Sequence, residues 1–470
     1  MNTASNQLQK TIDQAVPSKL TGLSRDQVAG LNAKVQAESV KNGFTYERDA
    51  GRPEPITLHP LPVVVGPDEA AKLRDLALEL RKILMRVLPH ARKHPQLTQL
   101  LPLDPEEESF LGRVYSKQLD EDPPLAYRLD ADIDFTDPGW YDKVKLFGLN
   151  GSAVAGYYYS SAANDLMADL VARETGLELP RFDRLGMPEV LLAMLQAQAA
   201  RVGRKAQNFA YIQDRSWNTG ITEGPSFQEW FKKRGVNLVV IDPRELSLKE
   251  SEIYAGDVMI DIVYRNMEIR DLVSIEREHG HLRALEQAFA RNQVVSSLWG
   301  DFDHKSLWEL LDTPEATRRL TAAQRAFLRN HIPWTRTLRH TFTRTSDGER
   351  VDLLEHVRKN RESLVIKPNR ACQGQSVCLG PRVTQSDWEK HLSTATSQSG
   401  HWVVQSFVKA TTKGFPLIMD GTYGMEAIPT TYGFVATPER FGCLGRASRN
   451  PVVNVSLGGG VFPVLLVDQG

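Results

Sequence analysis

The apolar positions of residues 61–290 follow two different periods. Stretches with apolar residues every three or four positions predict helices, and short continuous apolar runs predict strands. The clearest helix is expected near residues 68–87, where leucines recur. Strands are predicted at residues 143–147, 209–213, 237–242 and 258–264, with helices at 163–174 and 226–234. Strands separated by helices indicate an α/β layer.

The last third of the chain, from about residue 290, has a different order of elements. Helices are predicted at residues 306–311 and 322–329, followed by strands at 364–366, 377–379, 402–405 and 452–455. Helices followed by a run of strands are typical of an α+β unit. The expected organisation is therefore a polar N-terminal arm (1–60), an α/β region (61–290) and an α+β region (291–470).

Composition and charge exclude several classes of protein. The 470 residues are 41% hydrophobic and include 57 Lys and Arg against 58 Asp and Glu, a formal charge of −1. A nearly neutral chain has no global field that attracts nucleic acid or a membrane. The polar first twenty residues lack the apolar centre of a signal peptide, and no run of about 18 apolar residues predicts a spanning helix. We therefore expect a soluble, cytoplasmic protein that acts on small molecules.

Cysteine and histidine give no sign of a disulfide framework or a zinc site. The chain has three cysteines, Cys372, Cys378 and Cys443. That number is too small for a disulfide framework and fits a reducing compartment. Among the 11 histidines, the nearest group is His279-Gly-His281, which lacks the i, i+4 pair of a helical zinc motif.

Residues 364–377 carry the clearest chemical signal. An apolar strand delivers Lys367, ends at Pro368 and opens into a loop that contains Gly374. A fixed cation followed by a flexible loop of backbone N–H groups suits the phosphates of a nucleoside triphosphate. A single lysine on a strand more often has a structural role, so the order of the surrounding motifs decides the interpretation.

That order resembles the nucleotide-binding half of the ATP-grasp family over roughly residues 300–410. Lys305 opens a helix, Thr335 follows Ile-Pro-Trp, and Gln405 ends an apolar strand after Lys367. The resemblance implies that Lys305 and Lys367 contact ATP phosphates. It further implies a loop that covers the triphosphate (Gln373, Gly374, Gln375, Ser376) and a linker that binds adenine through its backbone (Gln405, Ser406, Phe407, Val408). The family linker often begins with Glu, where this chain has Gln405.

The C-terminal run 441–460 is the second constellation. It supplies Arg446, then a turn, then Asn454 and a glycine triplet, a combination that suits an oxyanion. By itself this run is equally a glycine-rich loop between two strands. Together with the first constellation it resembles the end of circularly permuted ATP-grasp proteins. The resemblance implies that Arg446 balances the charge of the transferred phosphoryl group, with Lys367 as the second catalytic cation and Asn454 at the cofactor.

Circular permutation places the metal-binding segment upstream. Residues 128–135 and 143–152 resemble the corresponding segment of glutathionylspermidine synthase-like proteins, which implies that Asp134 and Asn150 bind Mg²⁺. Gly148 occupies the position of an expected glutamate. Three alternatives follow: another carboxylate such as Asp132 completes the site, one Mg²⁺ is lost, or catalysis is impaired. Asp134 is equally explained as a turn residue.

Substrate contacts are expected at three residues. Asn150 and Ser152 belong to a loop of small residues that a substrate backbone can approach closely. Arg265 ends a strand and faces either a substrate carboxylate or a structural ion-pair partner.

The resemblance as a whole implies an ATP- and Mg²⁺-dependent carboxylate–amine ligase. Such an enzyme forms an amide or peptide bond through an acyl phosphate, with an amino acid or small peptide as the default acid. Two alternatives share the same motifs: a non-catalytic ATP-binding protein and an ATP-grasp phosphotransferase.

Overall fold

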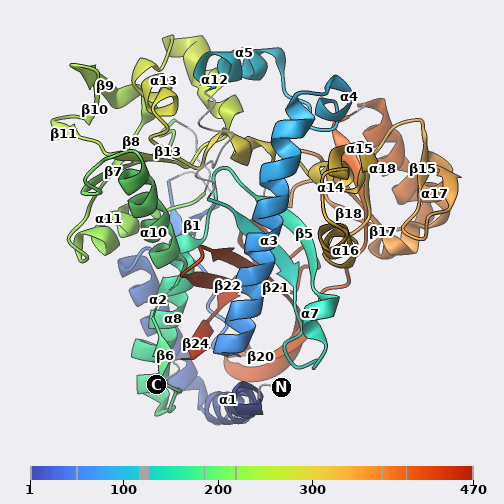
Figure 1. Cartoon of the computed structure of the whole chain (residues 1–470). Coiled ribbons are helices and arrows are strands. Elements are labelled where there is room, and N and C mark those ends of the chain that lie inside the picture. Colours follow the sequence, from blue (N-terminus) through green and yellow to red (C-terminus); the bar gives the residue numbers. More distant parts are fainter. Residues whose placement is uncertain are drawn as a thin grey trace.

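An antiparallel sheet of six strands forms the middle of the molecule, as Figure 1 shows. The computed structural model describes residues 3–48, 51–115, 126–184, 186–216, 220–371, 374–398 and 400–467. The sheet has the order β23-β22-β21-β4-β5, and β20 pairs with the first part of β21. Its strands are β4 (Arg128–Asp132), β5 (Lys145–Asn150), β20 (Thr412–Met419), β21 (Thr422–Ala436), β22 (Phe441–Ala447) and β23 (Gly460–Phe462). Strands from the first third and from the end of the chain therefore share one sheet.

A parallel four-stranded sheet lies beside the central sheet and forms the expected α/β layer. Its order is β13-β12-β7-β8, and its strands are β7 (Asn208–Ile212), β8 (Asn237–Ile241), β12 (Ile262–Arg265) and β13 (Val294–Val295). The helices of this region are α10 (Met187–Arg201), α11 (Gly224–Lys232), α12 (Ile269–His279) and α13 (Arg283–Ala290). All four residues of β12 are buried, as expected for a parallel sheet with both faces covered. The mixed α/β class predicted from the sequence is confirmed.

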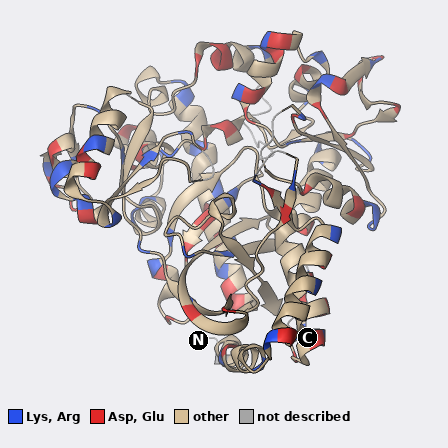
Figure 2. Cartoon of the chain, turned by 180° about the vertical axis from the view of Figure 1, so that it is seen from behind, with Lys and Arg blue, Asp and Glu red and all other residues tan. Residues whose placement is uncertain are grey.

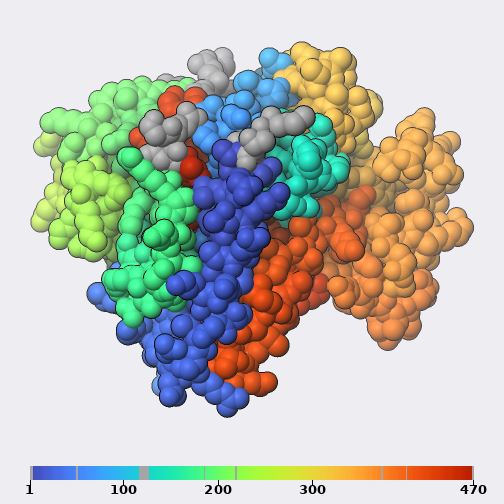
Figure 3. Space-filling model, turned by 90° about the horizontal axis from the view of Figure 1, so that it is seen from below, coloured from blue at the N-terminus to red at the C-terminus, as the bar shows by residue number. Residues whose placement is uncertain are grey.

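Residues 335–406 form a lobe with a hydrophobic core of its own. Its sheet has the order β14-β19-β17-β18, and these strands are β14 (Thr335–Thr337), β17 (Leu364–Pro368), β18 (Cys378–Leu379) and β19 (Trp402–Ser406). Helices α17 (Leu353–Lys359) and α18 (Gln385–Ser397) complete the lobe. Trp388 of α18 packs in this core with Ile366 of β17. Figure 3 shows the lobe, in light orange, projecting from the side of the molecule.

The N-terminal residues differ from the expected arm. They form α1 (Thr3–Thr21) and α2 (Arg25–Lys41), and α1 contributes Ile12, Val16 and Leu20 to the main core. The Gln9 side chain donates to the carbonyl of Pro62 (3.2 Å) and accepts from the backbone N–H of Val64 (2.6 Å). Apolar residues four positions apart give α1 its buried stripe, although the polar residues around them dilute the pattern.

One predicted strand is wrong. Residues 452–455 form a turn that leads into a short 3-10 helix, Val455–Leu457. The Asn450 side chain accepts from the N–H of Val452 (2.9 Å), and the Asn454 side chain accepts from the N–H of Ser456 (3.0 Å). Asparagine side chains that bond the nearby backbone favour turns over a strand ladder, which explains the difference.

The remaining elements connect these units. The long helix α3 (Pro67–Arg92) crosses the central sheet in Figure 1. The other helices are α4 (Pro95–Thr98), α5 (Pro105–Val114), α7 (Trp140–Lys143), α8 (Tyr157–Asp165), α9 (Ala172–Thr175), α14 (Leu307–Asp312), α15 (Pro314–Thr317) and α16 (Ala322–His331). The other strands are β1 (Thr45–Glu47), β2 (Pro53–Pro55), β3 (Val63–Val65), β6 (Phe182–Asp183), β9 (Leu246–Lys249), β10 (Glu252–Ala255), β11 (Val258–Met259), β15 (Phe342–Arg344), β16 (Arg350–Asp352) and β24 (Val464–Val467).

Charged residues of both signs are spread over the helices, as Figure 2 shows, in keeping with the formal charge of −1. Among the described residues, none of the helices is both long enough and apolar enough to span a membrane.

Candidate functional site

Lys367 is held in place by side chains from two neighbouring strands. Its Nζ donates to Oε1 of Gln405 (2.7 Å), and Nε2 of Gln405 donates to Oγ1 of Thr335 (3.0 Å). The register of β14, β19 and β17 places these residues together, because Gln405 pairs with Thr335 on one side and with Val365 on the other. Three residues that the sequence singled out thus form one chain of hydrogen bonds. Gln405 accepts from the lysine through its side chain, a contact that the sequence did not suggest.

Lys305 is tied to the loop that follows Lys367. Its Nζ donates to the carbonyl of Ala371 (2.6 Å), and its backbone N–H donates to the carbonyl of Asn369 (3.0 Å). The Asn369 side chain in turn accepts from the N–H of Ser306 (2.9 Å). The start of the 305 segment and the end of β17 are therefore fixed against each other, so that both predicted phosphate lysines border the same loop.

The predicted triphosphate loop packs against the C-terminal turn. Gly374 has φ +73°, and a Cβ at this position would lie 2.7 Å from Cγ1 of Val452. Only glycine combines this left-handed backbone with such a close approach. Gln375 and Ser376 continue the turn, and Ser376 also has a positive φ of 55°. Gln373 lies outside the described residues.

Arg446 belongs to a compact charged group centred on Asp130. Oδ1 of Asp130 contacts Nη2 of Arg446 (2.8 Å) and accepts from Nε of Arg128 (2.9 Å). Oδ2 accepts from Nη2 of Arg128 (3.2 Å) and from Nδ2 of Asn150 (3.1 Å). Burial alone would raise the pKa of Asp130, but the two guanidinium charges outweigh it and lower the pKa to about 2. Asp130 is therefore ionised at neutral pH, and each of its two oxygens makes two contacts.

The register of the central sheet corrects the expected pairing of Asp134 with Asn150. Asn150 pairs with Arg128 at one end of β4, whereas Asp134 follows the other end of that strand. Six residues of extended chain span roughly 20 Å, too far for two ligands of one ion. Asp134 is exposed, and its Oδ1 accepts from the N–H (3.0 Å) and the hydroxyl (2.6 Å) of Thr136. The turn alternative thus describes its contacts, and Asp130 is the carboxylate beside Asn150.

Gly148 faces Asp130 directly. The two residues pair in the β4–β5 register, and a Cβ at position 148 would lie 3.8 Å from Oδ2 of Asp130. A longer acidic side chain at this position would stand next to Asp130 and Asn150. Gly148, which occupies the position of the glutamate expected from the resemblance, therefore lies within the charged group around Asp130.

Lys367 lies near both Lys305 and the charged group around Asp130. The pKa of Lys367 is lowered to about 7, mainly by burial and also by the positive charge of Lys305, while the negative charge of Asp130 acts in the opposite direction. Lys367 also lies over the ring of Phe147 on β5, with Nζ 5.7 Å from the ring centroid. The projecting lobe and the central sheet therefore contribute to one site around this lysine.

ATP affinity should fall as the pH rises above about 7. Lys367 binds phosphate as an ammonium ion, so its pKa is higher in the complex than the value of about 7 in the free protein. The affinity is thus complete below pH 7 and decreases by up to about tenfold per pH unit above it. Titration calorimetry with ATP between about pH 7 and 9, in two buffers of different ionisation enthalpy, measures both the decrease and the proton uptake. An affinity that does not change over this range would contradict the assignment.

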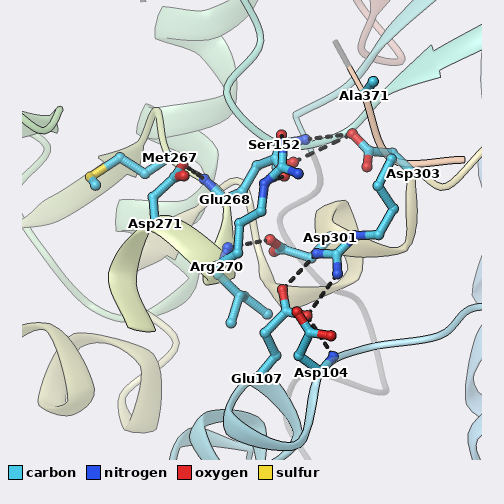
Figure 4. Close-up of polar contacts among 12 residues, drawn as sticks. Asp104, Glu107, Ser152, Met267, Glu268, Arg270, Asp271, Asp301, Asp303 and Ala371 are labelled. Atoms are coloured by element: carbon cyan, nitrogen blue, oxygen red, sulfur yellow. Dashed lines mark hydrogen bonds and ion pairs between the residues drawn. The ribbon is translucent and has the colours of Figure 1, made fainter. Parts of the chain in front are cut away.

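Ser152 lies next to a pair of acidic residues that Figure 4 shows. Oδ2 of Asp303 accepts from the N–H groups of Gly151 (2.9 Å) and Ser152 (3.3 Å), and both oxygens of Glu268 contact Arg270 (2.7 and 3.0 Å). Burial raises the pKa of both carboxyl groups, and the charge of Asp303 raises that of Glu268 further. The predicted substrate loop therefore contacts Asp303, which is two residues before Lys305.

Arg265 forms a structural ion pair, the second of the two roles expected for it. Its side chain is completely buried and forms an ion pair with Asp301, which is also buried. The guanidinium group donates to the carbonyls of Ser296 (3.1 Å), Ser297 (3.0 Å) and Met267. With these partners and no exposed surface, the geometry supports the ion-pair reading over a substrate contact.

The remaining predicted cofactor residues make contacts within the protein. The N–H of Ser406 donates to Trp334, and the N–H of Phe407 donates to Ser363 (2.7 Å). Val408 follows the end of β19, and Oδ1 of Asn454 caps its own turn. Adenine binding by this linker therefore stays a prediction.

Three carboxylates of the site, Asp130, Glu268 and Asp303, are not among the residues that the sequence singles out. Asp130 has a sequence signal, because Arg128 and Asp130 are two residues apart on a strand and share one face. Glu268 and Asp303 come from segments that only the tertiary structure brings together.

Comparison with known proteins adds a result at the level of the fold. The sequence matches no known protein family and no curated protein. The structure is similar to that of a glutathione synthetase-like effector from Globodera pallida in its apo form. The similarity has a TM-score of 0.59 at 10% sequence identity, and it covers 95% of this chain and 99% of the other. The chain therefore shares its mixed α/β fold with a glutathione synthetase-like protein.

Proposed function

We propose that this protein is an ATP-dependent carboxylate–amine ligase. The observation that carries the proposal is the meeting of cations at Lys367. Lys305 and Lys367 border one loop, and Lys367 is close enough to Asp130, and so to the Arg446 group, for its pKa to respond to that charge. Cations from three separate segments that lie near one another fit a triphosphate and a developing phosphoryl charge.

The reaction needs positioned charge and no nucleophilic side chain. A substrate carboxylate oxygen attacks the γ-phosphorus of ATP, the bond to the β-phosphate oxygen breaks, and ADP leaves. The resulting acyl phosphate is attacked by an amine, which forms the amide, expels phosphate and loses a proton. Lys305 and Lys367 hold the phosphates, and Arg446 stabilises the charge of the transferred group. An amino acid or small peptide is the proposed acid, placed at the Asn150–Ser152 loop.

The residues fit ATP better than they fit Mg²⁺. Magnesium prefers oxygen ligands, usually one or two carboxylates besides the phosphates of the substrate. Both oxygens of Asp130 are occupied by Arg128, Arg446 and Asn150, and Gly148 supplies no side chain. Asn150 retains its amide oxygen. No step of the proposed reaction is therefore assigned to a metal held by these residues.

A turnover assay tests the ligase. The purified protein is incubated with ATP, Mg²⁺ and pools of amino acids and small amines, and ADP, phosphate and new amides are measured. The ligase predicts ADP and phosphate in equal amounts only when both an acid and an amine are present. A phosphorylated product without an amide would replace the ligase by a phosphotransferase.

Both oxygens of Asp130 are already engaged by protein side chains, and this favours a second candidate function, the binding of ATP without turnover. In that case ATP binds in a calorimetric titration, but none of the pools yields ADP. The Gly148→Glu variant separates the two candidates, because it places a carboxylate beside Asp130 and Asn150. Turnover that appears only in this variant would show that the natural chain binds nucleotide without using it. Turnover in the natural chain would exclude the second candidate.

A further inference from the structure

A cluster of possible metal ligands lies away from the proposed ATP site, at the turn between α12 and α13. Glu276 is on α12, His281 is in the turn and Glu286 is on α13. One ligand atom from each side chain lies within 4.8 Å of the other two. The three residues are five positions apart along the chain, so the turn brings them together rather than the repeat of a single helix.

The distances within this cluster match a metal site better than a hydrogen bond. Nδ1 of His281 lies 3.6 Å from Oε1 of Glu276 and 3.4 Å from Oε1 of Glu286. Hydrogen bonds between nitrogen and oxygen are typically about 2.7–3.2 Å long. Nitrogen and oxygen ligands at roughly 2.0–2.2 Å from a tetrahedral Zn²⁺ lie roughly 3.4 Å from each other. The histidine nitrogen is therefore spaced from the two carboxylate oxygens as ligands of one ion would be.

Of the three residues, His281 also borders a cavity. A cavity of about 400 Å³ is lined by His281, together with His279, Arg244, Leu246 and Leu282 among others. The His281 side chain is 59% exposed, whereas those of Glu276 and Glu286 are 11% and 25% exposed. Three protein ligands with one side open are the arrangement of a zinc ion that keeps a position for water or a ligand.

Arg113 is the main competitor for the two carboxylates. Its Nε donates to Oε1 of Glu286 (3.0 Å), and its Nη2 donates to Oε2 of Glu276. The Oε1 atom of Glu276 that faces His281 is distinct from the Oε2 atom that Arg113 holds, although it accepts from the N–H of Leu282 (3.2 Å). In Glu286 the same Oε1 atom faces His281 and accepts from Arg113, so an ion would have to displace Arg113 there. An outer hydrogen-bond donor of this kind orients ligating carboxylates, although its charge lowers the affinity for a cation.

We propose that Glu276, His281 and Glu286 form a Zn²⁺ site at the α12–α13 turn. The imidazole selects Zn²⁺ over Mg²⁺, which prefers oxygen ligands alone. The site is independent of the proposed ligase, because none of its residues belongs to the ATP site.

Zinc titration of the whole chain tests this site. Binding of Zn²⁺ is measured by calorimetry for the natural protein, His281→Ala and His279→Ala. His279 is the matched control, because it lines the same cavity but does not belong to the cluster. We expect His281→Ala to weaken Zn²⁺ binding by more than the roughly 10–100-fold that loss of an outer partner costs. His279→Ala should bind Zn²⁺ like the natural protein, and Mg²⁺ should not compete.

A second substitution makes the test independent of the histidine. Glu286→Gln keeps the shape of the side chain and removes its charge, so Zn²⁺ affinity should fall by at least about tenfold. Thermal unfolding without zinc confirms that each variant is folded. The proposal is overturned if the natural protein shows no saturable Zn²⁺ binding. It is also overturned if His281→Ala binds as tightly as the natural protein, or if both histidine variants lose the same affinity.

Discussion

Asp301→Ala should lower the free energy of unfolding by about 3–5 kcal/mol, the usual effect of removing one partner of a buried ion pair. Arg265 and Asp301 are both buried, and the substitution leaves the guanidinium charge without its counter-ion. It also removes the oxygen that accepts the N–H of Ile269 (2.6 Å) at the start of α12. Urea unfolding followed by circular dichroism measures the change.

An exposed ion pair provides the control for this prediction. Asp257 contacts Lys249 at 3.2 Å, but its side chain is fully exposed, so Asp257→Ala should change stability by less than about 0.5 kcal/mol. Equal stability losses in the two variants would contradict the structural role of Arg265.

The double variant Arg265→Met with Asp301→Leu separates the two roles of Arg265. It should recover much of the stability, because apolar residues often replace a buried pair without loss. If the double variant is stable but has no ligase activity, Arg265 contacts the substrate after all.

Elements defined by local periodicity can be predicted from this sequence. The apolar runs predict β7, β8, β17 and β19 to within one or two residues, and the leucine pattern predicts α3. These features depend on which side chains are buried along one segment, and the sequence records that directly. Lys305 and Lys367, the proposed phosphate lysines, also belong to local motifs, and the resemblance of those motifs to a known family singled them out.

The local sequence does not show whether Asp130 or Asp134 lies beside Asn150 and Arg446. Residues 128, 130, 132 and 134 alternate in the same phase along an extended chain, so periodicity gives their side chains the same face. The pairing of β4 with β21, some 300 residues later in the chain, decides which of them meets Arg446. A register shift between Asp130 and Ala131 changes the alignment further. Long-range pairing, and not the motif, thus selects the carboxylate.

The proposed zinc site is a second case in which a local sequence pattern does not show which residues the fold brings together. A search for helical metal motifs looks for ligands three or four residues apart on one helix. Glu276, His281 and Glu286 are five residues apart and are brought together by the turn between two helices. The His279-Gly-His281 spacing therefore pointed away from zinc, although one of these histidines faces two carboxylates.

Lys367→Ala should raise the dissociation constant of ATP by about tenfold or more. A hydrogen bond to a charged group contributes about 1.5–3 kcal/mol, and every 1.4 kcal/mol corresponds to about a tenfold change in affinity. The loss should be measured by calorimetry about one pH unit below 7, where most of Lys367 is protonated in the free protein. Gln405 would also lose its partner, so a thermal unfolding curve must show that the variant is folded.

Lys359→Ala is the matched control for Lys367→Ala. Lys359 belongs to the same lobe, at the end of α17, and its side chain is 73% exposed. Removing it deletes the same charge from the same part of the protein without touching the site, so ATP affinity should stay unchanged. If both variants weaken ATP binding equally, the effect is one of overall charge. If a folded Lys367→Ala variant binds ATP like the natural protein, the nucleotide does not bind at this lysine and the proposed ligase site is wrong. A large loss for Lys367 alone would place the phosphates between the projecting lobe and the central sheet, where the Arg446 group is in position to act on them.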